Sequence, residues 1–231
     1  MSSIAANLQQ VRQRITRSCD DAGRPAQSVT LLAVSKTFGA TRLREAHAAG
    51  QRDFGENYVQ EALSKMDALA ELRAGLRWHF IGPLQSNKTR AVAERFDWVH
   101  SVDRLKIAQR LAEQRPTALP PLQLCLQVNI SGEASKSGLA PDEVLAVARE
   151  VAALPAGRVR LRGLMAIPEP VDDVQAQRRP HRALRELLGA LNACGLALDT
   201  LSMGMSADLE AAVAEGATIV RIGTAIFGAR A

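Results

Sequence analysis

The amino-acid sequence predicts an α/β protein folded as a single (β/α)8 TIM barrel with an extra N-terminal helix. Eight short apolar runs alternate with helix-like stretches, which is typical of a parallel sheet whose strands are joined by helices. The length of 231 residues lies within the usual range for a closed eight-stranded barrel, and no Pro- or Gly-rich linker divides the chain. We therefore expect one domain over residues 1–231, with a doubly wound open sheet as the alternative.

The first expected element is the extra helix, which precedes the first strand. Ser2 or Ser3 can cap it, and apolar residues recur on one face at helical spacing: Ile4, Leu8, Val11 and Ile15. Eight strands are expected after it, and they are Val29–Val34, Asp53–Gly55, Trp78–Ile81, Trp98–Val102, Leu122–Ile130, Val159–Ile167, Leu198–Met203 and Ile219–Ile222.

Helices are expected between these strands. Two of them show clear apolar faces, formed by Val144, Val147, Ala148 and Val151 in one and by Leu184, Leu187, Leu188 and Leu191 in the other. Gly50 and Gly216 each follow an alanine-rich segment, at the position where the end of a helix favours a left-handed residue.

Lys36 lies at the end of the first apolar run, where the carboxyl end of a strand would open onto the functional face of a barrel. Burying an amine there is costly unless the group has a task. Desolvation lowers the pKa of a lysine amine and yields the uncharged nucleophile that carbonyl chemistry needs. The alternative is an ordinary lysine that extends into solvent.

The segments after the last two strands suggest a phosphate site, since such sites favour these loops in barrels. After strand seven, Ser206 is expected to cap a helix that carries Asp208, leaving first-turn amides facing an anion. After strand eight, Gly223 allows close backbone approach and Thr224 adds a hydroxyl. Two ordinary turns with a helix cap are the alternative.

Composition excludes several classes of function. The net charge of +5 is spread along the chain, which does not favour nucleic-acid binding. The sequence has no apolar run long enough for a membrane helix and no signal-peptide pattern. Its four histidines form no close ligand pair, so no metal is expected. Three isolated cysteines, Cys19, Cys125 and Cys194, indicate reduced thiols in a cytoplasmic protein.

Several motifs together resemble the pyridoxal phosphate homeostasis proteins, nearly end to end. The segments that carry the resemblance are Ala33–Thr37, Phe54–Glu61, Trp78–Lys88, His100–Asp103, Val128–Ile130, Gly163–Pro168, Leu201–Ser206 and Val220–Thr224. The resemblance implies a fold-type III barrel like the N-terminal domain of alanine racemase, with pyridoxal 5'-phosphate as cofactor. No departure is seen in the motifs that would carry the cofactor.

The resemblance also implies roles for individual residues. Lys36 matches the lysine that forms a Schiff base with the cofactor aldehyde. Ser206, Gly223 and Thr224 match the positions that hold its phosphate, and Asn57 matches a polar contact near the ring hydroxyl.

Arg221 matches the arginine that faces the pyridine nitrogen. Within its strand it alternates with Val220 and Ile222, so it shares neither residue's face of the sheet. A fixed cation beside this nitrogen disfavours its protonation and weakens the ring as an electron sink. Met203 and Met205 are expected to line the pocket, although apolar packing alone would also explain them.

Two further residues are assigned more ordinary roles. His79 is expected to be a hydrogen-bonded core histidine instead of a cofactor contact. Lys136 lies in a polar loop over the same face of the barrel, where a lid or plain surface is expected and transient receipt of the cofactor is the alternative.

The preferred function is a carrier, not an enzyme: a pyridoxal phosphate homeostasis protein that buffers the cofactor or delivers it to apoenzymes. The alternative is an amino-acid racemase. Racemisation needs a proton donor on each face of the substrate carbon. Racemases take the second base from an added domain of a partner subunit, and the chain ends soon after the barrel. A third hypothesis is a barrel enzyme independent of the vitamin that acts on a phosphorylated metabolite. The protein is expected to be a monomer.

Overall fold

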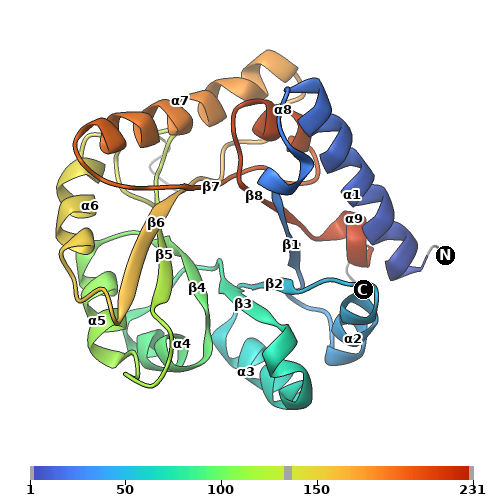
Figure 1. Ribbon diagram of the computed structural model, residues 1–231, viewed down its shortest axis with the longest axis horizontal. Coiled ribbons are helices and arrows are strands. Elements are labelled where there is room, and N and C mark those ends of the chain that lie inside the picture. Colours follow the sequence, from blue (N-terminus) through green and yellow to red (C-terminus); the bar gives the residue numbers. More distant parts are fainter. Residues whose placement is uncertain (1–2, 133–136, 229–231) are drawn as a thin grey trace.

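Eight parallel strands pair in chain order and close into a barrel (Figure 1). This computed structural model describes residues 3–132 and 137–228. The strands are β1 (Thr30–Val34), β2 (Asp53–Glu56), β3 (Arg77–Phe80), β4 (Trp98–Val102), β5 (Leu122–Gln127), β6 (Val159–Met165), β7 (Thr200–Ser202) and β8 (Ile219–Ile222). Pairing of β8 with β1 completes the ring. The predicted (β/α)8 barrel is therefore confirmed, and the open sheet is excluded.

Three strands differ from their expected bounds by two or more residues at one end. β5 stops at Gln127, because Val128 forms only an isolated bridge with Leu139. β6 stops at Met165, short of the expected end at Ile167. β7 begins at Thr200 because the Leu198 amide donates to the Asn192 side chain and not to a neighbouring strand. At β7, local hydrogen bonding therefore decides where the apolar run joins the ladder.

Helices form the outer layer, as the alternation predicts. The α-helices are α1 (Ile4–Asp21), α2 (Ala40–Ala48), α3 (Val59–Ala68), α4 (Thr89–Arg95), α5 (Leu105–Gln114), α6 (Val144–Ala152), α7 (Val174–Ala193), α8 (Leu209–Ala214) and α9 (Thr224–Phe227). Short 3-10 helices are η1 (Ala26–Ser28), η2 (Ala70–Gly75) and η3 (Ser86–Lys88). The left-handed glycines are confirmed, with φ of 86° at Gly50 and 96° at Gly216. In the described part of the chain, no helix combines the length and apolar character that crossing a membrane requires.

The extra helix α1 packs outside the last units of the barrel, alongside α8 and α9 (Figure 1). Ser3 caps it, because its hydroxyl accepts from the Ala6 amide at 3.2 Å. Arg24, just beyond its end, donates to the carbonyl oxygens of Val213 and Ala217 at 2.6 and 2.8 Å. These contacts attach the end of α1 to the segment between β7 and β8.

The core has two parts. The larger lies between strands and helices, where the faces predicted for α6 and α7 are buried or packed against it. A small second cluster of Leu32, Ile81 and Ile219 has Trp98 packed against it. These residues come from β1, β4, β8 and the end of β3, so the cluster lies inside the ring of strands. The interior of the ring also contains buried polar side chains, among them His79, His100, Ser202 and Arg221.

Candidate functional site

A cavity of about 310 Å³ opens at the carboxyl ends of the strands. Residues from four separate predicted motifs meet in it. The six residues to which the resemblance assigns a contact with the cofactor all line this cavity: Lys36, Asn57, Ser206, Arg221, Gly223 and Thr224. The lysine after β1 and the loops after β7 and β8 therefore share one space, as a barrel requires of a working site.

Lys36 lies two residues beyond the end of β1 and is half-buried. The backbone is held on both sides of it. The Ser35 amide donates to the Gly55 carbonyl at 3.0 Å, and the Thr37 amide donates to Glu61 Oε1 at 2.5 Å. Thr37 has φ of 71°, a left-handed conformation that a β-branched residue rarely adopts. Such strain persists only where the surroundings impose it, and it is common at functional sites.

A buried ionic network lies behind Lys36. Lys65 Nζ is 2.7 Å from Glu56 Oε1 and 2.5 Å from Glu61 Oε1, and it donates to the Ser35 carbonyl at 2.7 Å. The Ser35 hydroxyl donates to Glu56 at 2.6 Å. Burial raises the pKa of Glu56, against the opposing effect of Lys65. The sequence analysis missed this network, although the i,i+4 spacing of Glu61 and Lys65 on one helix was an available signal.

Arg221 reaches the cavity from inside the barrel. Its Nη1 donates to the Ser202 carbonyl at 2.6 Å and to Ser202 Oγ at 3.0 Å, and its Nη2 donates to the Ala166 carbonyl at 2.8 Å. Burial lowers the pKa of Arg221 to about 10, so the guanidinium stays charged at neutral pH. Val220 and Ile222 belong to the outer core, which is the larger core between the strands and the helices. Arg221 therefore faces the opposite side of the strand, as predicted.

Ser206 does not cap a helix, which corrects the sequence prediction. α8 begins only at Leu209, and Ser206 lies in a turn before it. Asp208 organises this turn instead, accepting from the Met205 amide at 2.6 Å and lying 2.9 Å from His181 Nε2. Burial alone would raise the pKa of Asp208, but the hydrogen bonds from His181 and the amide outweigh it and lower the pKa.

Two glycines allow the walls of the cavity to approach each other. Gly204 has φ of 90°, and a Cβ there would lie 2.5 Å from the Ala212 Cβ. The Gly204 carbonyl accepts from the Arg221 amide at 2.9 Å, which joins the turn to β8. Gly223 lies where a Cβ would be 3.2 Å from the Val34 carbonyl oxygen, so this glycine keeps the loop after β8 close to the end of β1.

Asn57 follows β2 and lines the cavity. A Cβ at Gly82 would lie 2.2 Å from the Asn57 carbonyl oxygen, so this backbone approach depends on glycine. Asn57 Oδ1 is buried and accepts no hydrogen bond from the described residues. A buried acceptor beside a cavity suits a ligand that brings a donor.

Met203 does not line the cavity. It is fully buried in the outer core, and its amide donates to the Ile219 carbonyl at 3.1 Å. Successive residues of a strand face opposite sides, so Met203 points outward where Ser202 points into the barrel. Met205 lines the cavity instead, as expected.

His79 is a buried core histidine, as expected, with both ring nitrogens within hydrogen-bond distance of partners. Lys136 lies outside the described residues. Among residues 3–132 and 137–228, no group of three or more histidine, cysteine or acidic side chains is arranged to hold a metal ion.

The whole chain matches known proteins. The family model for the alanine racemase N-terminal domain matches residues 1–231. A pyridoxal phosphate homeostasis protein of Pseudomonas aeruginosa is 65% identical over 230 residues, covering 100% of this chain and 97% of that protein. The protein of the same name from Escherichia coli K12 is 54% identical over 231 residues, covering 100% and 98%.

Solved structures agree with this match. PipY of Synechococcus elongatus, solved with PLP bound, has a TM-score of 0.84 and 40% identity, covering 98% of this chain and 100% of that chain. Alanine racemase from Corynebacterium glutamicum has a TM-score of 0.73 at 19% identity and covers 98% of this chain but 61% of its own, so it supports the fold alone. The chain belongs to the pyridoxal phosphate homeostasis protein family, whose barrel is the alanine racemase N-terminal domain.

Proposed function

We propose that this protein binds pyridoxal 5'-phosphate covalently and reversibly at Lys36 and acts in the homeostasis of that cofactor, buffering or delivering it. One observation carries the proposal. The side chain of Lys36, the loops after β7 and β8 and the guanidinium of Arg221 line one cavity of about 310 Å³. The cofactor supplies an aldehyde carbon that accepts a primary amine. A solved relative, PipY of Synechococcus elongatus, has PLP bound.

The lining residues suit the polar groups of this cofactor. Ser206, Gly223 and Thr224 would hold the phosphate, since a hydroxyl and close backbone amides favour an anion. Asn57 Oδ1, buried and without a donor among the described residues, would accept from the ring hydroxyl. Arg221 would face the pyridine nitrogen. Met203 takes no part in this proposal, because it lies in the outer core.

One feature favours a carrier over an amino-acid racemase, and it is the set of ionisable residues in the cavity lining. Among the described residues that line the cavity, Lys36 and Arg221 are the ionisable ones. Tyr58, which follows Asn57, is 57% exposed and does not line it. A second base for racemisation is therefore missing from this lining.

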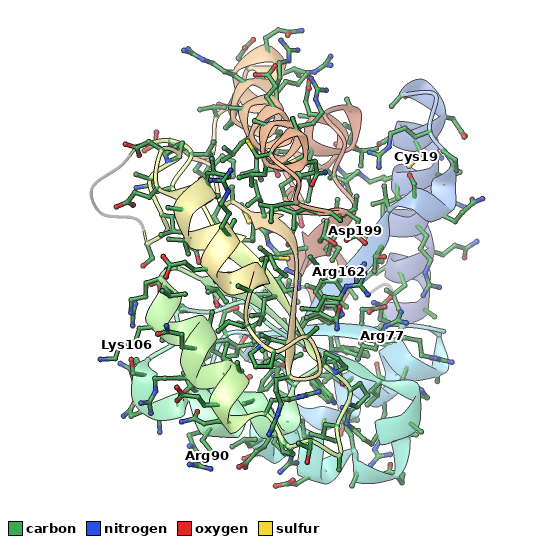
Figure 2. The ribbon with its side chains drawn as sticks, turned by 60° about the vertical axis from the view of Figure 1, so that its left-hand side comes forward. Cys19, Arg77, Arg90, Lys106, Arg162 and Asp199 are labelled. Carbon is green, nitrogen blue, oxygen red and sulfur yellow. The ribbon has the colours of Figure 1, made fainter. Side chains whose placement is uncertain are left out.

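Borohydride reduction tests the proposal. The protein is incubated with pyridoxal 5'-phosphate, reduced, digested and mapped by mass spectrometry. We expect the label on Lys36, and we expect Lys36→Ala to abolish it. Lys106→Ala is the matched control, because Lys106 is exposed on α5 (Figure 2) and is not one of the residues that line the cavity. Absence of uptake, or a label that persists in Lys36→Ala, would refute the proposal.

Turnover separates the carrier from the enzyme. Incubation of the loaded protein with common L-amino acids should produce no D-enantiomer above the level of Lys36→Ala. Steady racemisation by the wild type would overturn the carrier assignment. Transfer is measured by recovery of activity in a PLP-dependent apoenzyme, compared with release into a trapping amine alone.

The remaining features of the proposal concern the protein as a whole. We propose one cofactor-binding domain over residues 1–231, acting as a monomer in the cytoplasm, where the free thiols of Cys19, Cys125 and Cys194 would stay reduced. Pyridoxal phosphate and PLP-dependent apoenzymes are the proposed partners, and nucleic acid is not. Light scattering of the loaded and unloaded protein measures the oligomeric state.

A further inference from the structure

Polar side chains cross the interior of the barrel from its amino-terminal mouth to the cavity. Asp53 Oδ1 lies 3.1 Å from His79 Nε2, and His79 Nδ1 lies 2.9 Å from His100 Nε2. His100 Nδ1 lies 2.7 Å from Ser202 Oγ, which accepts from Arg221 Nη1 at 3.0 Å. We call these five residues the interior chain. Arg221 alone among them lines the cavity.

The interior chain runs through the middle of the barrel and not around its wall. His100 is on β4 and Ser202 is on β7, and these strands are not neighbours in the ring. A side-chain hydrogen bond between them must therefore cross the interior. His100 and Ser202 are fully buried, and His79 and Arg221 are nearly so. Polar groups this deep hold their partners firmly, because an unpaired one would be costly.

The hydrogen bonds of the interior chain have a defined direction. Burial would raise the pKa of Asp53, but hydrogen bonds from His79 and Arg77 outweigh it and lower that pKa to about 2, so this carboxylate only accepts. At the other end Arg221 only donates. Burial lowers the pKa of His100 well below its usual value, with His79 and Arg221 adding to the effect, so this imidazole is uncharged.

With one proton on each imidazole, a single arrangement satisfies all five groups. His79 donates from Nε2 to Asp53, and His100 donates from Nε2 to His79 Nδ1. The Ser202 hydroxyl then donates to His100 Nδ1, which leaves its oxygen lone pairs for Arg221. In the reverse arrangement, the bare Nε2 of His79 would face a carboxylate.

Other charges surround the two ends of the interior chain. Arg77 makes two hydrogen bonds of 2.6 Å to Asp53. The His79 ring stacks on the Trp98 ring, with centroids 5.5 Å apart. The Arg162 guanidinium lies over the Trp98 ring, 5.1 Å from its centroid. Arg162 forms an ion pair with Asp199, and both residues are labelled in Figure 2. At the cavity end, Asp208 and the thiol of Cys125 act electrostatically on Arg221.

We propose that Asp53, His79 and His100 are positioning residues that act through Ser202 to hold Arg221 in its orientation toward the cavity, and so toward the pyridine nitrogen of the cofactor. This inference rests on the proposed function and deepens it. None of the three touches the cavity, yet together they decide that Ser202 presents an acceptor to the guanidinium. If the Ser202 hydroxyl did not donate to His100, its proton could turn toward Arg221 and displace the guanidinium.

The first test uses the cofactor-free protein. Nitrogen-15 NMR of the imidazoles should show both His79 and His100 protonated at Nε2 and bare at Nδ1. Asp53→Asn removes the acceptor-only anchor and should give mixed tautomers. Arg77→Gln is the matched control, because it removes the other partner of Asp53 and leaves the His79 contact in place. Protonation of His100 at Nδ1 in the wild type would overturn the proposal.

The second test reads the effect at the cavity. His100→Leu removes the acceptor of the Ser202 hydroxyl. We expect the pH midpoint of the bound cofactor's absorbance to move by about one unit, and its release to a trapping amine to quicken about tenfold. His100→Asn should restore both values, because its amide oxygen can occupy the place of Nδ1. An unchanged midpoint and release rate in a folded His100→Leu, checked by circular dichroism, would refute the positioning role.

The two proposals fail separately. Absence of cofactor uptake by the wild type would refute the proposed function. The histidine tautomers are measured on the cofactor-free protein, so they would still test the direction of the hydrogen bonds in the interior chain. If His100→Leu does not fold, Asp53→Asn takes its place in the release assay, with the same expected direction and Arg77→Gln as control.

Discussion

Lys36 depends on side chains that do not line the cavity. Lys65 joins Glu56 on β2 to Glu61 on α3 and bonds the Ser35 carbonyl, one residue before Lys36. Glu61 in turn accepts from the amide of Thr37, one residue after it. The backbone at Lys36 is therefore held from both sides. Orienting a reactive amine by supporting contacts is how rigid sites keep their geometry.

Replacing Lys65 tests this support. Lys65→Met leaves the buried Glu56 without its cation, which should lower the free energy of unfolding by about 3–5 kcal/mol. Urea denaturation measures the change. Lys106→Met, at an exposed position on α5, should stay within about 0.5 kcal/mol of wild type. An equal loss in both variants would show that the ionic network contributes nothing specific.

The same variant should also acquire a distinct pH dependence. Burial raises the pKa of Glu56, and loss of Lys65 removes an opposing effect. The folded state then retains a proton that the unfolded state releases, so stability should fall as pH rises above the normal range of a glutamate. Urea midpoints from pH 4 to pH 8 should decline more steeply for Lys65→Met than for wild type. A parallel pair of curves would contradict the assignment.

Among the secondary-structure elements, the turn between β7 and α8 determines the shape of the phosphate side of the cavity. The sequence pattern predicts a helix start at Ser206. In the structure the chain turns at Gly204, and the helix begins only at Leu209. Asp208 holds the intervening residues through the Met205 amide and His181. His181 comes from α7, so a neighbouring helix takes part in shaping this turn.

Substitution at Gly204 tests the turn. Gly204→Ala combines an unfavourable φ of 90° with a Cβ only 2.5 Å from that of Ala212. We expect a loss of about 1–3 kcal/mol in stability and at least tenfold weaker uptake of pyridoxal 5'-phosphate, measured by absorbance titration. Gly23→Ala is the control, because its φ is also positive, at 63°, but a Cβ there meets nothing within 4 Å. Unchanged uptake in Gly204→Ala would exclude the turn from phosphate binding.

For the whole molecule, the barrel joins two mouths through a polar interior. Asp53 at the amino-terminal mouth is ionised because His79 and Arg77 outweigh the effect of burial. Arg221 at the other end is one wall of the cavity. A barrel interior is usually filled by branched apolar residues. Here a hydrogen-bonded chain takes part of that space, which the proposed positioning of Arg221 explains.

Acid should lower the free energy of unfolding, because it protonates Asp53 at the end of the interior chain. The pKa of Asp53 is lowered from 3.8 to about 2, so its contribution is present above pH 3.8 and is lost as pH falls toward 2. The depression corresponds to about 2 kcal/mol. Asp53→Asn should reduce the difference in unfolding free energy between pH 5 and pH 2.5 by about 1.5 kcal/mol, because part of the contribution persists at pH 2.5. An acid slope equal to that of wild type would place the effect on another carboxylate.

Much of this arrangement follows from local pattern. The bounds of β4 and β8 are as predicted. The meeting of Lys36 with Thr224 follows from the rule that carboxyl ends of parallel strands share one mouth. Met203 was misplaced because alternation at the end of a short strand depends on where the ladder stops.

The sequence alone determined the barrel, its order of strands and the chemistry gathered at one mouth, because periodicity and strand-end residues are local properties. Only the tertiary structure decided which polar groups meet across the interior. His100 and Ser202 are far apart in sequence and on strands that are not neighbours, so no spacing rule joins them. Their contact exists because closing the ring brings opposite walls within reach of a hydrogen bond, and burial then makes that bond obligatory.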